Sequence, residues 1–319
     1  MAEVPSKQYF ERKATETGFL TNNLEKVYRI TRILDEIDSL DTEGYLALRG
    51  GTAVNLCYQS IPRLSIDIDL VYVKSFDKKA MERDRITIRA SLDRIFNFLR
   101  YAAESKTPYA LDQYLLTYRN RAGNIDRVKV EVNYVACRVP ILKVEKRKMV
   151  GLFETGQQEV AALAQEELYG SKIKALIERG IARDLFDIYH IARNMGSIDF
   201  QAFKRATIFY SCLELESDFR RKIGHRLLSS IDENTVRRGL KPLLRRDADF
   251  PLEESKRTVN DLISRISALN EEEKEFVEAF YSLNYRPDLL FASNPALKYH
   301  PGAEWRLSIL ARKSGSPLL

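Results

Sequence analysis

Hydrophobic side chains recur at helical spacing from about Lys7 to Leu40, which predicts one or two amphipathic helices in this part of the chain. The positions expected to face a core are Leu24, Val27, Tyr28, Ile30, Ile33, Leu34 and Ile37. A further amphipathic helix is predicted over residues 78–103. Its apolar positions are Ile86, Ile88, Leu92, Ile95, Phe96 and Leu99.

Two short apolar runs between these helices have the character of strands. Residues 45–51 read YLALRGG, and Thr52 is placed to cap a following helix with the sequence AVNLCYQ. Ile61-Pro62 would break that helix. Residues 65–73, SIDIDLVYV, then predict a second strand.

A β-hairpin is predicted after the helix at 78–103. Its arms are residues 113–120 and 126–135, joined by the turn sequence RAGN. Val128, Val130, Val132 and Tyr134 alternate with polar residues, so one face of the second arm is apolar. From about Val160 onward the pattern is helical. We therefore expect an α+β fold with a small mixed sheet in residues 1–155, followed by a helical domain in residues 156–319.

The composition limits the class of protein. Hydrophobic residues make up 45% of the 319 positions, enough for a sizeable core. The apolar runs are far shorter than the ~20 residues of a membrane span, and the N-terminal residues lack a signal-peptide core. Cys57, Cys137 and Cys212 are widely spaced and lack Cys-x-x-Cys pairing, which favours inert thiols in a reducing cytoplasm. We expect a cytoplasmic protein without a membrane partner.

The chemistry-bearing residues gather around the second strand. Asp67 and Asp69 leave the same face of that strand, about 6.6 Å apart, because strand side chains alternate. Two carboxylates this close favour a cation between them, and hard oxygen ligands suit Mg²⁺ or Mn²⁺. Gly50 and Gly51 precede a helix, where free backbone amides bind anions, and Thr52 could add a hydroxyl donor. A plain structural turn is the alternative for these glycines.

This order of Gly-Gly-Thr, helix and Asp-x-Asp strand resembles the signature of the DNA polymerase β-like nucleotidyltransferase superfamily. The resemblance implies a third metal-binding carboxylate on a neighbouring strand, and Glu131 in VKVEVNY is the residue that matches. It also implies that Gly50, Gly51 and Thr52 hold the phosphates of a nucleoside triphosphate.

Two further blocks resemble the AbiEii/AbiGii-type nucleotidyltransferase toxins. These blocks are residues 166–194, with the run RDLFDIY, and the segments RPDLLF and KYHPGAEWRL within 286–307. The resemblance implies that Lys172 grips the triphosphate, with Lys174 as the alternative, and that Asp184 lies at the catalytic site. Asp184 and Asp187 could instead form structural ion pairs with Arg183. His300 would fix the C-terminal segment, with Trp305 as its buried anchor.

The resulting prediction is an Mg²⁺-dependent enzyme that moves a nucleoside monophosphate from an NTP to an acceptor hydroxyl and releases pyrophosphate. The net charge of +6 permits a nucleic-acid partner. The resemblance implies an RNA acceptor, in particular the 3′ end of tRNA, and a cognate antitoxin of a bacterial toxin–antitoxin or phage-abortive system. The alternatives are transfer to a protein hydroxyl, a non-catalytic nucleotide-binding module of the same fold, and a nuclease that uses the same metals.

Overall fold

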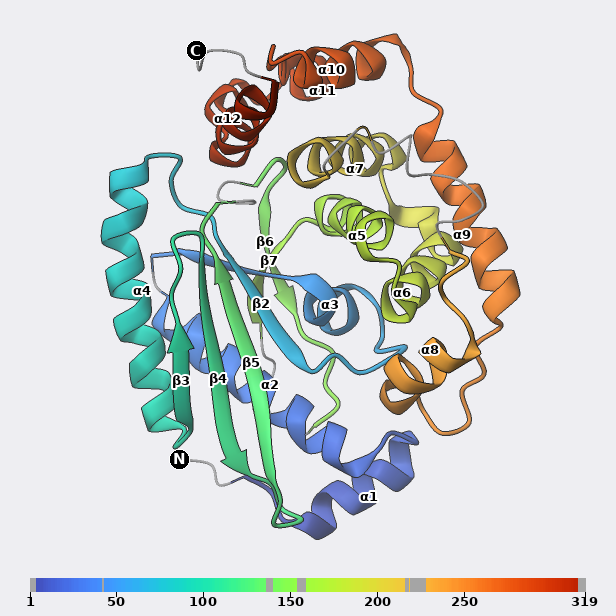
Figure 1. The fold of residues 1–319 in the computed structure, drawn as a ribbon. Coiled ribbons are helices and arrows are strands. Elements are labelled where there is room, and N and C mark those ends of the chain that lie inside the picture. Colours follow the sequence, from blue (N-terminus) through green and yellow to red (C-terminus); the bar gives the residue numbers. More distant parts are fainter. Residues whose placement is uncertain are drawn as a thin grey trace. The chain divides into compact units, whose positions relative to one another are not determined.

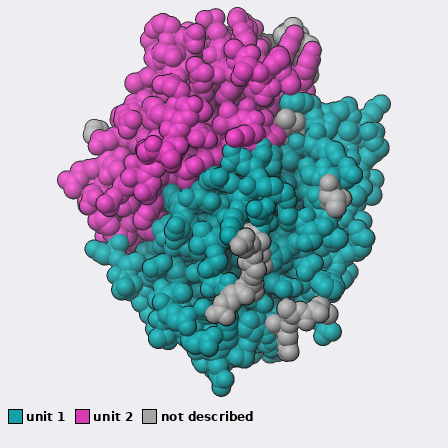
Figure 2. All heavy atoms as spheres, turned by 180° about the vertical axis from the view of Figure 1, so that it is seen from behind, with its two compact units in different colours: residues 1–134, 144–163, 240–249 teal, residues 135–143, 164–239, 250–319 magenta. Residues whose placement is uncertain are grey.

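The computed structural model describes residues 4–41, 43–135, 140–153, 159–215, 218 and 228–314. The chain divides into two compact units, shown in different colours in Figure 2. The first comprises residues 1–134, 144–163 and 240–249, and the second comprises residues 135–143, 164–239 and 250–319. Each unit is therefore built from separate stretches of the chain. The roles expected for residues 1–155 and 156–319 remain predictions.

A seven-stranded mixed sheet forms the centre of the first unit, in the order β3-β4-β5-β2-β1-β7-β6 (Figure 1). The strands are β1 (Leu46–Arg49), β2 (Asp67–Tyr72), β3 (Ala102–Lys106), β4 (Leu111–Arg119), β5 (Ile125–Asn133), β6 (Val144–Lys148) and β7 (Glu159–Leu163). Strand β2 lies antiparallel to β1 and parallel to β5, while β4 and β5 form the predicted antiparallel hairpin. The α+β fold with a mixed sheet is confirmed.

The helices of the first unit bury the faces that the sequence predicts. They are α1 (Lys7–Thr17), α2 (Thr21–Leu40), α3 (Gly50–Ala53) and α4 (Lys78–Phe98). Helix α2 packs against α4 and β7, and its seven predicted core positions are all buried. Gly18 separates α1 from α2 with φ +77°, and its amide donates to the carbonyl of Ala14.

The prediction for α4 is wrong at two points. The helix ends at Phe98 rather than at residue 103, and Ile86 is 71% exposed instead of buried. Ile88 and Leu92 define the apolar face of α4, and Ile86 lies about 200° away from Ile88 around the helix. Ile86 therefore points away from the core.

The junction between β1 and α3 also differs from its prediction. Strand β1 ends at Arg49, and Arg49 rather than Thr52 occupies the N-cap position. Thr52 lies inside α3, where its buried hydroxyl donates to the backbone carbonyl of Asp67. The helix continues as a π-helical turn over Val54–Tyr58 and ends before Ile61-Pro62. Thr52 thus ties α3 to the start of β2.

The second unit is helical (Figure 1). Its helices are α5 (Gln165–Arg179), α6 (Ala182–Arg193), α7 (Phe200–Glu214), α8 (Glu233–Gly239), α9 (Leu252–Ser267), α10 (Glu271–Tyr281), α11 (Asp288–Phe291) and α12 (Pro301–Ser314), with short 3₁₀ turns at Met195–Ser197 and Pro295–Tyr299. A third 3₁₀ turn, Lys241–Leu243, belongs to the first unit. The helical pattern starts at Gln165 and not at Val160, because residues Glu159–Leu163 pair with β1 and β6 as strand β7.

Close contact between α5 and α7 depends on Gly170. A Cβ at this position would lie 2.7 Å from the backbone nitrogen of Thr207, so no larger residue fits without moving α7. The end of the chain is fixed by His300, which is fully buried and packs edge-to-face on Phe209 at 5.1 Å. Trp305 is 55% exposed, so its predicted role as a buried anchor is wrong.

The exposure of Trp305 follows from the periodicity of α12. Ala303 and Arg306, three positions apart, are buried on one face, and Trp305 falls on the opposite side. Of the cysteines, Cys212 is buried and Cys57 is half-buried. Burial raises the pKa of the Cys57 thiol to about 12, which agrees with an inert thiol. Cys137 lies outside the described residues.

Candidate active site

Strand β2 places two carboxylates on one face of the sheet. Ile68 and Leu70 are buried, whereas Asp67 and Asp69 alternate with them and are half-buried. This alternation follows directly from the side-chain period of two. Asp67 and Asp69 are therefore neighbours on the same side of one strand, as the sequence predicts.

The register between β2 and β5 brings the third predicted carboxylate beside this pair. Glu131 lies directly opposite Asp69, and Lys129 lies opposite Asp67. Residues paired in register share a face of the sheet, and neighbouring strands are about 4.8 Å apart. The sheet therefore gathers Asp67, Asp69 and Glu131 on one face of the first unit.

Glu131 is held by two neighbours that the sequence analysis does not identify. Its carboxylate accepts from the side-chain amide of Gln113 at 2.5 Å and lies 2.9 Å from the ammonium of Lys129. Gln113 stands opposite Glu131 in the β4–β5 ladder. The hairpin turn could have shown this pairing, since Gln113 and Glu131 are equally distant from Ala122 at its centre.

Gly50 brings the backbone against one of the aspartates. Its φ is +72°, a left-handed conformation that favours glycine. A Cβ built at Gly50 would lie 2.2 Å from Oδ2 of Asp69. Both the backbone conformation and the space at this position therefore exclude a side chain. The first residue of α3 and the Asp69 carboxylate are in direct contact.

These residues offer hard oxygen donors of the kind that divalent cations prefer. Asp67 and Asp69 fit a cation through two half-buried carboxylates on one face. Within the described ranges, however, no group of three or more His, Cys, Asp or Glu side chains is arranged to hold a metal ion. Glu131 points its carboxylate to Gln113 and Lys129 instead. The fit is thus to a cation held by two aspartates, with other ligands supplied from outside that pair.

The predicted residues of the second unit form a buried ionic cluster. The ammonium of Lys172 on α5 lies 3.2 Å from Asp184 and 2.9 Å from Asp187, both on α6. These three side chains are only 7%, 1% and 0% exposed. Arg179 adds a second cation, with its Nε 2.6 Å from Asp184. Two cations therefore balance two carboxylates.

The charges of this cluster determine the ionisation of Asp184. Burial by itself raises the pKa of the Asp184 carboxyl, but the cations of Lys172 and Arg179 outweigh burial and lower it below its usual value. Asp184 is consequently ionised at neutral pH. Its partners are Lys172 and Arg179 rather than Arg183, the partner named in the ion-pair alternative.

Lys174 points to different partners. It is 6% exposed and pairs with Glu178 on its own helix at 3.2 Å and with Glu214 on α7. Lys172 and Lys174 therefore take part in separate ion-pair clusters, although only one residue separates them. Which lysine contacts a triphosphate remains a prediction.

Comparison with known proteins identifies the family. A family model described as the nucleotidyl transferase AbiEii toxin of type IV toxin–antitoxin systems matches residues 32–284. The chain belongs to the AbiEii family. It is a nucleotidyltransferase toxin, and its family implies a nucleoside triphosphate as substrate and an antitoxin as partner. A search of curated protein sequences gave no match.

Solved structures show the same fold. MenT4, a nucleotidyltransferase toxin from Mycobacterium tuberculosis H37Rv, is similar with a TM-score of 0.64 and 14% identity, over 96% of this chain and 99% of that chain. JHP933 from Helicobacter pylori is similar with a TM-score of 0.49 and 18% identity, over 83% of this chain and 98% of that chain. Among the described residues of the AbiEii chain, no helix is both long and apolar enough to cross a membrane.

Proposed function

We propose that this AbiEii-family toxin transfers a nucleoside monophosphate from an NTP to a hydroxyl of RNA, specifically at the 3′ end of tRNA. The observation that carries the proposal is the direct register of Asp69 with Glu131, together with the backbone of Gly50 against Asp69. The acceptor follows from the family resemblance and from the net charge of +6, which suits a polyanion.

Asp67 and Asp69 are the residues proposed to hold Mg²⁺, with Mn²⁺ as an alternative. When bound, the metal would stabilise negative charge that develops on the phosphate oxygens. Gly50 and Gly51 leave room for phosphate oxygens near the backbone, and Thr52 supports this loop through its bond to the Asp67 carbonyl. Thr52 thus has a positioning role rather than the direct phosphate contact expected from the sequence.

In the proposed reaction, the acceptor hydroxyl oxygen forms a bond to the α-phosphorus while the bond from that phosphorus to the bridging oxygen of the β-phosphate breaks. Pyrophosphate leaves, and the hydroxyl proton passes to a carboxylate. We assign that proton to Glu131, because the lowered pKa of Asp184 makes Asp184 a weak proton acceptor. Asp184 then serves to hold Lys172 in place.

Lys172 is proposed to bind the β- and γ-phosphates, with Lys174 as the alternative. An ammonium has three N–H donors, and Lys172 directs two of them to Asp184 and Asp187. One donor is thus left for a phosphate oxygen, and the two aspartates fix its direction. Lys174 already pairs with Glu178 and Glu214, so Lys172 is the stronger assignment.

The test is transfer of label from each of the four α-labelled NTPs, in the presence of Mg²⁺, to total tRNA. Label should move to RNA with the wild-type protein and not with Asp69→Ala. Asp93→Asn on the exposed face of α4 is the matched control and should retain activity. Label in protein bands would show that the acceptor is a protein hydroxyl. Triphosphate binding without transfer would identify a non-catalytic nucleotide-binding module.

A further inference from the structure

A cavity of about 450 Å³ lies in the first unit, away from the carboxylates of β2. We call it the arginine pocket, because its lining includes the five arginines Arg29, Arg32, Arg100, Arg119 and Arg121. Helix α2, the end of α4 and the β4–β5 hairpin supply these residues. Its volume falls within the range of about 300–1,000 Å³ that is usual for small-molecule sites.

The arginine pocket opens on the other face of the sheet from the candidate active site. Along β4, Tyr118 contributes to the pocket, whereas Gln113 contacts Glu131 on the opposite face. These two residues differ by an odd number of positions, so their side chains leave opposite faces of the strand. A ligand in the pocket would therefore not occupy the site formed by Asp67 and Asp69.

The positive charge of this pocket is only partly neutralised. Arg29 is buried and bonded through its Nε and Nη2 to Glu25 at 3.0 and 2.7 Å, so that pair is neutral. Arg32 contacts Glu36 at 3.5 Å near the surface, where an ion pair is weak. In the described structure no Asp or Glu lines the pocket itself.

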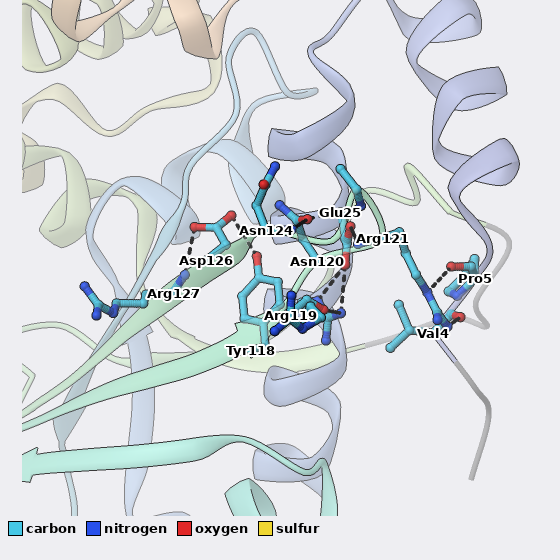
Figure 3. Close-up of polar contacts among 12 residues, drawn as sticks. Val4, Pro5, Glu25, Tyr118, Arg119, Asn120, Arg121, Asn124, Asp126 and Arg127 are labelled. Atoms are coloured by element: carbon cyan, nitrogen blue, oxygen red, sulfur yellow. Dashed lines mark hydrogen bonds and ion pairs between the residues drawn. The ribbon is translucent and has the colours of Figure 1, made fainter.

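The other arginines are bound to uncharged groups or reach solvent. Arg119 donates to the carbonyl of Gly123 at 2.6 Å, and Arg121 donates to the carbonyls of Pro5 and Val4, as Figure 3 shows for Arg121. Carbonyl oxygens orient a guanidinium but leave its charge in place. Arg100 is exposed at the rim. The pocket therefore concentrates uncompensated positive charge, which suits an anion.

Aromatic rings complete the wall of the cavity. Tyr28, Tyr101 and Tyr118 line it, and the guanidinium of Arg29 lies 3.9 Å from the centre of the Tyr118 ring. The hydroxyl of Tyr118 is held by Asp126 at 3.1 Å, which fixes the ring (Figure 3). Flat aromatic and guanidinium surfaces suit a nucleobase, and guanidinium forks suit a phosphate.

We propose that the arginine pocket binds a nucleotide through its 5′-phosphate, either a free mononucleotide or the phosphorylated end of an RNA strand. The size of the cavity, the unneutralised guanidiniums and the aromatic wall all match this ligand. The site is separate from the catalytic carboxylates, so binding there does not depend on transfer activity.

The test measures binding by calorimetry in the Asp69→Ala protein with EDTA, which removes metal-dependent binding at β2. The probes are AMP, adenosine, and a short RNA with either a 5′-phosphate or a 5′-hydroxyl. We expect AMP or the phosphorylated RNA to bind, and adenosine and the 5′-hydroxyl RNA to bind at least tenfold more weakly. AMP binding would identify a free nucleotide as ligand, and binding of the phosphorylated RNA alone would identify an RNA end.

The variant Arg32→Ala/Arg100→Gly removes two cations without disturbing the buried Arg29–Glu25 pair. Glycine also suits position 100, where φ is +61°. We expect about a 100-fold loss of affinity, roughly tenfold for each guanidinium. The matched control Arg83→Ala/Arg94→Ala removes two exposed charges from α4 and should change affinity less than threefold. Equal binding by both double variants, no binding of any probe, or equal binding of both RNAs would overturn the proposal.

Discussion

Replacement of Gly50 by alanine tests the contact on which the candidate active site depends. The new Cβ would lie 2.2 Å from Oδ2 of Asp69, so this carboxylate must move by about 1 Å to restore an ordinary contact. A misplacement of that size can cost about 100-fold in catalytic rate. The left-handed φ of +72° adds about 1–2 kcal/mol of backbone strain, and the overlap adds about 1–3 kcal/mol.

Gly44 provides a matched control for this substitution. Its φ is +69°, nearly that of Gly50, but a Cβ at Gly44 meets nothing within 4 Å. Gly44→Ala should therefore lose only the backbone contribution of about 1–2 kcal/mol in urea unfolding and should keep its activity. Gly50→Ala should lose about 2–5 kcal/mol and about 100-fold in nucleotidyl transfer. If both variants lose the same stability and activity, the close approach of Gly50 to Asp69 is refuted.

Three other substitutions test individual charges. Lys172→Ala leaves Asp187 buried without its cation and should cost about 3–5 kcal/mol in urea unfolding. Asp184 has a lowered pKa when folded, so it stabilises the protein above about pH 4, and this contribution is lost as the pH falls further. The unfolding free energies of wild type and Asp184→Asn should accordingly differ at pH 7 and converge in acid. Glu131→Gln should slow transfer by about 10²–10⁴-fold with little change in stability.

Each of these has an outcome that contradicts it. Unchanged stability of Lys172→Ala would show that the buried cluster does not hold α5 against α6. A constant difference between wild type and Asp184→Asn across the acid range would contradict the lowered pKa of Asp184. Full activity of Glu131→Gln would assign the proton to another group and leave Lys129 and Gln113 as the purpose of this glutamate.

Local patterns in the sequence were enough to place the main elements. The period of α2 predicted every one of its core positions, and the RAGN turn predicted the β4–β5 hairpin. Ile86 and Trp305 were misassigned because hydrophobicity alone does not state which face of a helix meets the core. Strand β7 was missed because five residues of mixed character become a strand only when β1 and β6 lie beside them.

By itself the sequence determined that Asp67 and Asp69 share one face, because the period of a strand is a local property of the backbone. The motif resemblance singled out Glu131 and the AbiEii family. Only the tertiary structure decided that Glu131 stands opposite Asp69, that Gln113 and Lys129 hold it, and that Gly50 meets Asp69. These contacts join residues far apart in the chain, so they depend on strand register and on packing, which no local pattern contains.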